Sequence, residues 1–142
     1  MIQELSPLNA KQLLPLMADL GYPNQELINL SQRIETFLSF ENSFLFGYFQ
    51  DEHLVGFGSL SMIPLIHEDG YLWRVSALVV RSNKQGNGIG KKLMFHMEQV
   101  AKIHNCIRVE LTSSGHRESK AYEFYQKIGY EKFDGVRFIK SL

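Results

Sequence analysis

The chain has 142 residues, of which 44% are hydrophobic, and this length and composition predict one globular domain over residues 1–142. Its 15 basic and 15 acidic side chains cancel, which argues against a nucleic-acid binder because such proteins usually carry a basic excess. Cys106 is the only cysteine, so no disulfide can form within the chain, and no segment approaches the roughly 20 apolar residues that cross a bilayer. The N-terminus shows no cleavable leader, so the expected location is cytoplasmic.

The N-terminal part of the sequence predicts a short strand followed by two helices. The strand covers residues 2–5, and residues 9–23 place apolar side chains at helical spacing. Pro15 is expected to kink that first helix or to mark a start within it, and Gly21 is expected to end it. Asn24 is expected to cap a second helix. The apolar face of this second helix consists of Leu27, Leu30, Ile34, Phe37 and Leu38.

The middle of the sequence changes to the period of strands. Residues 43–63 indicate a hairpin that turns at residues 50–52, and residues 71–80 indicate a third long strand. A loop with three glycines follows and leads into an amphipathic helix. The apolar stripe of that helix consists of Ile89, Leu93, Met97, Val100 and Ala101.

The C-terminal part predicts a buried strand at 106–112, a short helix at 117–129, and two final strands at 130–133 and 136–142 joined by an Asp-Gly turn. The expected order is therefore β-α-α-β-β-β-α-β-α-β-β. Only one strand–helix–strand unit is clear, at 71–112, and this favours an α/β fold with a mixed (α+β) sheet over a regular doubly wound sheet.

The glycine-rich loop at residues 85–91 has the character of a phosphate-binding loop but matches neither common template. A P-loop would need a glycine at Gln85, and the dinucleotide-binding fingerprint would need one at Lys91. A third alternative is a loop whose backbone N–H groups point at a pyrophosphate at a helix N-terminus, where donors are unpaired and the helix dipole is positive. A glycine-rich turn that binds nothing is the competing interpretation. The donors would come from Gln85, Gly86, Asn87, Gly88, Ile89, Gly90 and Lys91.

Two segments together resemble the GNAT superfamily of acyl-CoA-dependent N-acetyltransferases. Residues 85–90, Gln-Gly-Asn-Gly-Ile-Gly after Leu-Val-Val at 78–80, resemble the family motif R/Q-x-x-G-x-G/A. Residues 121–130, Ala-Tyr-Glu-Phe-Tyr-Gln-Lys-Ile-Gly-Tyr, resemble the family segment A-x-x-F-Y-x-x-x-G-F/Y. The separation of the two segments also resembles that of the family, and the pair is more specific than either motif alone.

The resemblance implies a GNAT-like acyl-CoA N-acyltransferase fold and acetyl-CoA as cosubstrate. Residues 85–91 would then hold the pyrophosphate of coenzyme A. Leu78, Val79 and Val80 would present backbone groups to the pantetheine arm and thioester, at a point where the family strand separates from its neighbour. A backbone N–H at Val79 or close to it would face the thioester oxygen. Tyr125 would act as the general acid that protonates the departing thiolate; a core tyrosine on an apolar helix face is the other interpretation.

The activity that the resemblance implies is transfer of the acetyl group of acetyl-CoA to a primary amine of a small molecule or peptide, by direct attack. No metal, nucleic-acid or membrane partner is expected, and a homodimer, which is common in the family, is left open. Two other functions also stay open from the residues. One is a regulatory module that binds acetyl-CoA without turnover, and the other is a domain that has kept only the fold.

Some positions depart from the family pattern. Glu118 stands where an asparagine is common, and whether it or Ser119 contacts the cofactor is open. Residues 74–77 carry no carboxylate where many members have an acidic residue, so the group that removes the amine proton is also open. The chemical candidates for this base are His67, Glu68, Glu110 and His116. The loop at 113–119, with Arg117, and the turn at 64–70 could shape the acceptor site.

Overall fold

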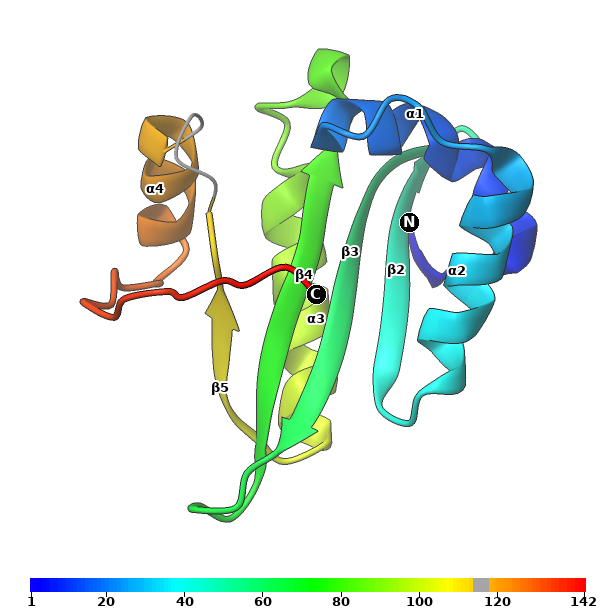
Figure 1. Cartoon of the computed structure of the whole chain (residues 1–142). Helices are drawn as coiled ribbons and strands as arrows, with labels where there is room; N and C mark the ends of the chain where they lie inside the picture. Colours follow the sequence, from blue (N-terminus) through cyan, green and yellow to red (C-terminus); the bar gives the residue numbers. More distant parts are fainter. Residues whose placement is uncertain (114–117) are drawn as a thin grey trace. The chain divides into compact units, whose positions relative to one another are not determined.

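The protein, represented by a computed structural model, is described over residues 1–113 and 118–142. It divides into two compact units, Met1–Thr112 and Ser113–Leu142, and each is described by itself. The first unit contains the sheet and three of the helices, and the second contains the last helix (Figure 1).

The first unit is built on a five-stranded sheet in the order β1-β2-β3-β4-β5. The strands are β1 (Ile2–Glu4), β2 (Ser43–Gln50), β3 (His53–Pro64), β4 (Tyr71–Val80) and β5 (Cys106–Leu111). Neighbouring strands are antiparallel from β1 to β4, whereas β4 and β5 run parallel. The mixed sheet that the sequence predicted is therefore confirmed, and the parallel pair β4–β5 is joined by a helical crossover, as parallel pairing requires.

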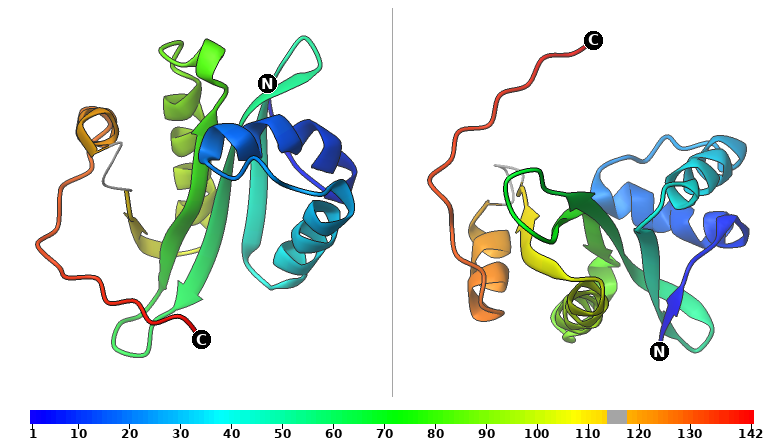
Figure 2. Two further views of the ribbon diagram at one scale, coloured as in Figure 1. Left: turned by 45° about the horizontal axis from the view of Figure 1, so that its top comes forward. Right: turned by 90° about the horizontal axis from the view of Figure 1, so that it is seen from below.

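Helices cover both faces of this sheet. Helices α1 (Ala10–Leu20) and α2 (Leu27–Ser39) pack on one face, and α3 (Ile89–Ile103) packs on the other (Figure 2). Each helix places an apolar stripe on the sheet, as its periodicity predicts. The buried side chains below α1 and α2 include Leu13, Leu16, Leu30, Ile34, Phe57 and Val79, and those on α3 include Ile89, Leu93, Met94 and Met97.

Glycines in β3 set the close approach of α3 to the sheet. A Cβ atom at Gly58 would lie 2.4 Å from Met97 Cε, and one at Gly56 would lie 3.2 Å from Ile89 Cγ2. Strand glycines commonly mark such close approaches. They bring the start of α3, and so the loop before it, close to the last residues of β4.

The expected end of α1 is confirmed and the expected cap of α2 is wrong. Gly21 ends α1 in the left-handed conformation, with φ of 111°. Pro15 lies inside α1, which continues to Leu20, so it does not start a new helix. The expected cap at Asn24 is wrong because α2 begins three residues later, with Glu26 at its N-cap in an extended conformation.

The second unit contains helix α4 (Glu118–Lys127), which ends close to the predicted Gly129, a residue with φ of 97°. The two expected final strands, at 130–133 and 136–142, are not formed in the described structure. Their sequences favour strands, but propensity alone does not make a strand without a partner and a buried face. Phe133 and Phe138 are 89% and 91% exposed, so no burial offsets the cost of ordering this segment.

None of the helices in the described ranges has the length and apolar character needed to span a membrane.

Candidate active site

The last half of β4 has a free edge. Pairing with β5 starts at Tyr71↔Cys106 and ends at Val75↔Leu111, whereas pairing with β3 continues to Val80↔Gly56. In the described part of the chain, residues 76–80 therefore have a strand neighbour on one side only. The separation of β4 from β5 that was expected around residues 78–80 is thus present, and unpaired backbone groups at such an edge can hydrogen-bond an extended ligand.

The register identifies which backbone groups point toward that edge. The N–H of Arg81 donates to the carbonyl of Val55 at 2.9 Å, so Arg81 pairs toward β3. Because antiparallel ladders alternate, Val79 also points its N–H toward β3, and the outward N–H groups belong to Leu78 and Val80. The side chain of Gln85 donates to the carbonyl of Val80 at 3.3 Å, which agrees with an outward carbonyl. The oxyanion donor predicted at or near Val79 is therefore best sought at these two neighbours.

The glycine-rich loop at residues 85–91 follows this edge after Arg81 and a short 3₁₀ turn, η2 (Ser82–Lys84), and its last residues form the start of α3. Gly86 and Gly88 have φ of 84° and 74°, a region that L-residues with side chains rarely adopt. A Cβ atom built at either position would meet no atom within 4 Å, so the space above both residues is open.

The start of α3 offers unpaired donors. Gly88 is the N-cap and supplies no capping side chain, and the first turn contains no acidic residue. The N–H groups of the first turn are therefore available, and the helix dipole is positive there. These are the properties of an anion-binding helix terminus, and they agree with the phosphate-loop interpretation.

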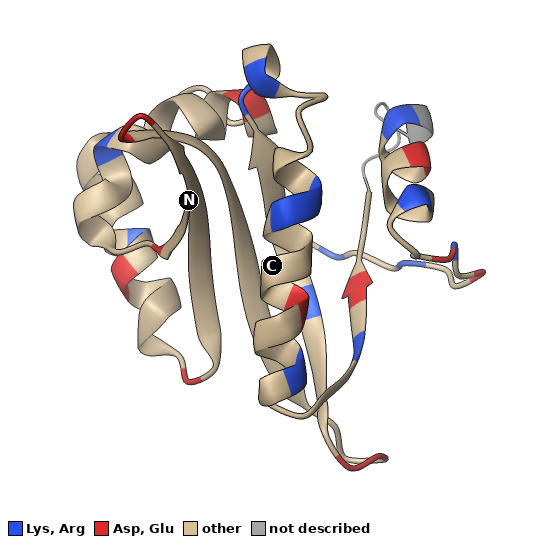
Figure 3. Ribbon diagram, turned by 180° about the vertical axis from the view of Figure 1, so that it is seen from behind, with Lys and Arg blue, Asp and Glu red and all other residues tan. Residues whose placement is uncertain are grey.

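Basic residues surround this helix terminus. Lys84 lies in η2, and Lys91 and Lys92 lie in the first turn of α3, where Figure 3 shows blue segments on both elements. Lys92 is partly engaged, since its Nζ lies 3.4 Å from the hydroxyl of Tyr48 and 5.6 Å from the ring centroid. Lys91 is exposed at the surface. Of the two, Lys91 is thus the more accessible to an anion.

An ion pair ties the end of β4 to α1. Arg81 Nε lies 3.3 Å from Asp19 Oδ2, with the two side chains 33% and 20% exposed. Partly exposed pairs contribute little to stability. Its role here is geometric, because it connects the residue before the glycine-rich loop to the end of α1.

Tyr125 lies on α4 in the second unit. Its ring packs edge-on against Phe124 at 5.0 Å and against Tyr130 at 5.8 Å between centroids. Burial raises the pKa of the Tyr125 phenol above its usual value of 10.0. The phenol is therefore protonated at neutral pH, which is the state that a general acid needs.

Three candidate bases form a chain of ion pairs away from the free edge. Glu110 Oε1 accepts from Arg108 Nε at 3.0 Å, and its Oε2 lies 3.9 Å from Arg74 Nη1. Glu68 Oε2 accepts from the same Arg108 at 3.3 Å, and Glu68 Oε1 lies 4.0 Å from the ring of His67. Their carboxylates are thus engaged beside the paired half of β4.

The remaining acceptor-site candidates belong to the segment around residues 114–119. His116 and Arg117 lie outside the described residues. The backbone of Glu118 and Ser119 belongs to α4, but their side chains are also outside the described structure.

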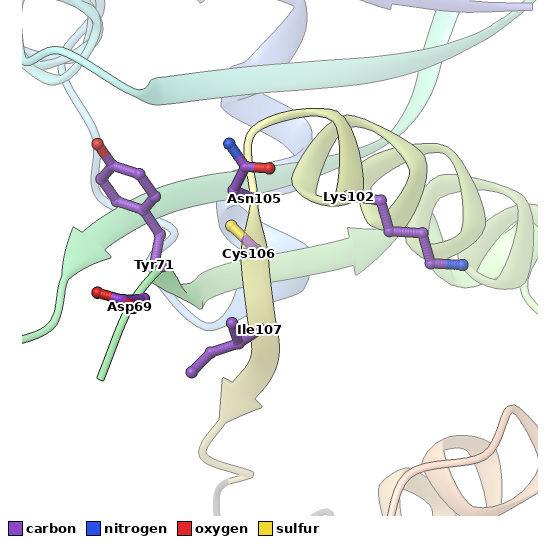
Figure 4. Close-up of a pocket in the computed structure, with 7 residues that line it drawn as sticks. Asp69, Tyr71, Lys102, Asn105, Cys106 and Ile107 are labelled. Carbon is purple, nitrogen blue, oxygen red and sulfur yellow. The ribbon is translucent and has the colours of Figure 1, made fainter. Parts of the chain in front are cut away.

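A cavity of about 610 Å³ lies at the opposite end of the sheet, where β4 and β5 begin and α3 has just ended (Figure 4). It is lined by Asp69, Gly70, Tyr71, Lys102, Asn105, Cys106 and Ile107. Burial raises the pKa of the Cys106 thiol, so the thiol is protonated and weakly nucleophilic at neutral pH. This end of β4 lacks the free edge and helix N-terminus that acyl transfer from a phosphate-bearing donor would use, so we do not assign the active site to it.

Sequence reasoning missed one feature of the site, a β-bulge at Ser76. Ser59 pairs with Ala77 and Leu60 pairs with Val75, so Ser76 has no counterpart on β3. Ser59 is a buried serine, 3% exposed, and its hydroxyl lies 2.7 Å from that of Ser76. A polar residue between apolar ones in β3 was the only available signal, and it did not reveal its partner.

Comparison with known families shows a match to the model of the "Acetyltransferase (GNAT) family" over residues 13–130. Comparison with curated protein sequences found no match.

Solved structures with the same fold include a GNAT family acetyltransferase of Staphylococcus aureus, with a TM-score of 0.83 and 22% identity over 100% of this chain and 98% of that one. An aminoglycoside acetyltransferase from an uncultured soil metagenomic sample, in complex with sisomicin, has a TM-score of 0.85 and 20% identity over 100% and 95%. The ribosomal-protein-alanine N-acetyltransferase of Brucella melitensis has a TM-score of 0.81 and 19% identity over 100% and 99%.

Proposed function

This chain belongs to the acetyltransferase (GNAT) family, and on that basis we propose that it transfers the acetyl group of acetyl-CoA to a primary amine of a small molecule or peptide. Members of the family use acetyl-CoA as acyl donor. The observation that carries the proposal is the free edge at residues 76–80 followed directly by an uncapped helix N-terminus. An extended arm ending in a diphosphate needs such a pair of neighbouring features.

The residues of the glycine-rich loop fit the diphosphate end of coenzyme A. Gly86 and Gly88 leave open space above their backbone, and the backbone N–H groups from Gln85 to Lys91 would supply the donors. Backbone groups of Leu78, Val79 and Val80 would contact the pantetheine arm. The outward N–H of Leu78 or Val80 would stabilise the negative charge that develops on the thioester oxygen during acyl transfer.

The proposed reaction is a direct transfer. The lone pair of the acceptor nitrogen attacks the carbonyl carbon of the thioester, and the carbon–sulfur bond breaks with its electron pair on sulfur. Tyr125 Oη donates a proton to that sulfur, the acceptor nitrogen loses one proton to water, and solvent reprotonates Tyr125. The phenol of Tyr125 carries its proton at neutral pH, as a general acid must, and the burial that raises its pKa makes it a weaker acid than a free tyrosine.

The acceptor class is inferred from the names of two similar structures. One similar structure is of an aminoglycoside acetyltransferase and another of a ribosomal-protein-alanine N-acetyltransferase, and both names describe amine acceptors. Sisomicin and a peptide with an N-terminal alanine are therefore suitable first probes. Spermidine adds a small flexible polyamine to the panel.

A matched pair of glycine variants tests the cofactor site. Gly88→Ala and Gly21→Ala both place a methyl group at positive φ, where a Cβ meets no atom within 4 Å. Both variants should lose about 1–2 kcal/mol of stability. Only Gly88→Ala should also weaken acetyl-CoA binding, by about 10-fold in calorimetry, because its methyl group enters the space assigned to the diphosphate. Equal affinities in the two variants would place the cofactor elsewhere.

A second measurement tests turnover. Wild-type protein should release free CoA with at least one amine of the panel, and Tyr125→Phe should lower kcat by about 100-fold with acetyl-CoA affinity unchanged. Tyr130→Phe is the control, because its ring contacts that of Tyr125 but has no assigned proton transfer. If Tyr125→Phe matched the wild type, the general-acid role would be wrong.

One other function has a specific observation in its favour. Residues 74–77 contain no carboxylate to accept the amine proton, which favours a module that binds acetyl-CoA without turnover. Acetyl-CoA binding without CoA release from any amine of the panel would support this alternative.

A further inference from the structure

The bulge in β4 marks the point where β4 leaves β5. Val75 is the last residue of β4 that pairs with β5, and Ser76, the next residue, is the bulged one. Ser76 is exposed, whereas Val75 on one side is buried. Its hydroxyl is thus the first polar side chain of β4 at the start of the free edge.

A buried serine holds this bulge in place. The N–H of Ala77 donates to Ser59 Oγ at 2.8 Å, and Ser59 Oγ also lies 2.7 Å from Ser76 Oγ and 3.5 Å from the carbonyl of Ala77. Bulges re-aim side chains and often occur next to active sites. Ser59 is only 3% exposed, so its hydrogen-bond partners must be protein groups rather than water.

Either hydroxyl of the serine pair can be the donor of the bond between them. A hydroxyl has one donor and two acceptor positions. If Ser76 donates to Ser59, both lone pairs of Ser59 are filled and its own proton points to the carbonyl of Ala77. In the reverse direction Ser59 donates to Ser76, and Ser76 keeps its own proton and one lone pair. Ser76 Oγ therefore has at least one free acceptor position in either direction.

Ser76 Oγ can therefore accept a hydrogen bond at the start of the free edge whichever serine is the donor. Ser76 is exposed, so a ligand can reach this acceptor position. The outward N–H of Leu78 lies two residues further along the strand, about 7 Å away. At this separation the N–H of Leu78 can hold the oxygen of the thioester carbonyl, and the attacking nitrogen can lie between that carbonyl and Ser76.

We propose that Ser76 orients the acceptor amine by accepting an N–H hydrogen bond from it, and that Ser59 is the positioning residue that aims Ser76. This inference rests on the proposed acetyl transfer and names a group that recognises its acceptor. The N–H bond to Ser76 leaves the nitrogen lone pair directed at the carbonyl carbon. After attack, the nitrogen releases its proton to water, so Ser76 remains unchanged.

Serine variants test this proposal with the amine of the panel (sisomicin, spermidine or the alanine peptide) that gives the highest turnover. Ser76→Ala should raise the KM for the amine about 5- to 10-fold, because one hydrogen bond to the acceptor is lost. Its affinity for acetyl-CoA should equal that of the wild type, and its melting temperature should stay within about 2 °C. Ser76→Thr keeps the hydroxyl and should restore the KM.

Two further variants separate orientation from structure. Ser59→Ala removes the acceptor of the Ala77 N–H and should lower both the melting temperature and kcat/KM for the amine. Ser61→Ala changes a serine on the same face of β3, paired with Arg74 beside the paired half of β4, and should behave as the wild type. This control shows that loss of a strand hydroxyl alone has no effect.

The outcomes distinguish this inference from the function on which it rests. Unchanged amine KM in Ser76→Ala, or failure of Ser76→Thr to restore it, would overturn the inference and leave acetyl transfer intact. A loss of acetyl-CoA affinity equal to the change in amine KM would also overturn it, since Ser76 would then act on the strand rather than on the acceptor. If the wild type acetylated no amine of the panel, the proposed function would fail and this inference with it.

Discussion

The two halves of β4 have different surroundings. Residues 71–75 pair with β3 on one side and with β5 on the other, whereas residues 76–80 pair only with β3 in the described structure. The first half contains Trp73, which is 0% exposed, and borders a row of ion pairs. The second half begins at the bulge and leads into the glycine-rich loop.

This difference separates stability from chemistry along one strand. Backbone groups that are paired on both sides hold the sheet together and are unavailable to a ligand. An unpaired edge is a liability for a protein unless a partner uses it, and a substrate arm is such a partner. Changes in the first half should therefore affect folding, and changes in the second half should affect acetyl transfer.

Proline substitution in the second half should have the largest effect. Leu78→Pro and Val80→Pro each remove one outward N–H while leaving the bonds to β3 in place, and proline is tolerated at strand edges. The variant that removes the oxyanion donor should lose about 100-fold in kcat, measured by CoA release. Circular dichroism should show both variants folded.

Val79→Pro is the matched control for these prolines. It removes an N–H that points toward β3, so it should lower the free energy of unfolding by about 3 kcal/mol. If Val79→Pro were stable, or if Leu78→Pro and Val80→Pro both kept full activity, the assignment of outward and inward groups would be wrong.

Substitution in the first half should produce an intermediate effect, on stability alone. Trp73→Phe removes an indole whose Nε1 has no hydrogen-bond partner among the described residues, so its cost comes from the cavity left behind. We expect a loss of about 2 kcal/mol in urea unfolding, with unchanged acetyl-CoA affinity by calorimetry. A large loss of affinity at constant stability would show that the two halves of β4 are not separable.

The smallest effect should come from Cys106, which pairs with the first residue of β4. Burial raises the pKa of its thiol above 9.0, so the thiolate is scarce at neutral pH. Alkylation by iodoacetamide should be slow at pH 7.5 and accelerate as the pH rises through the raised pKa. Because the thiol pKa is higher in the folded state than in the unfolded state, its contribution to stability is fully present below the unfolded-state pKa. This contribution is lost as the pH rises through the folded-state pKa.

Labelled protein serves as the check on this prediction. Complete alkylation of Cys106 should leave acetyl-CoA affinity within about 2-fold of the unlabelled value, a change too small to represent a lost hydrogen bond. Rapid labelling at pH 7.5 would contradict the burial of the thiol.

The elements with strong periodicity were predictable from sequence. The apolar stripe through Leu93 and Met97 identified α3, and alternation over residues 43–63 identified the β2–β3 hairpin. The two motifs at 85–90 and 121–130 identified the family, and both lie within the region that matches the family model, residues 13–130. These features depend on residues close together in the chain.

The features that were missed depend on contacts between distant residues. The final strands at 130–133 and 136–142 had the right propensity but found no partner in the described structure. The bulge required Ser59 of β3 and Ser76 of β4 to meet, and the choice of Leu78 and Val80 over Val79 required the register of the two strands. No local pattern encodes such pairing.

From its order of residues alone, the chain specifies an acetyltransferase of the GNAT family with a glycine-rich loop between a strand and a helix. Local periodicity and short motifs suffice for that. The edge that β4 leaves open, and the direction of each N–H along it, emerge only when β3, β4 and β5 are assembled. Hydrogen bonds between strands are made by groups that are remote in sequence, and a shift of one residue reverses every one of them.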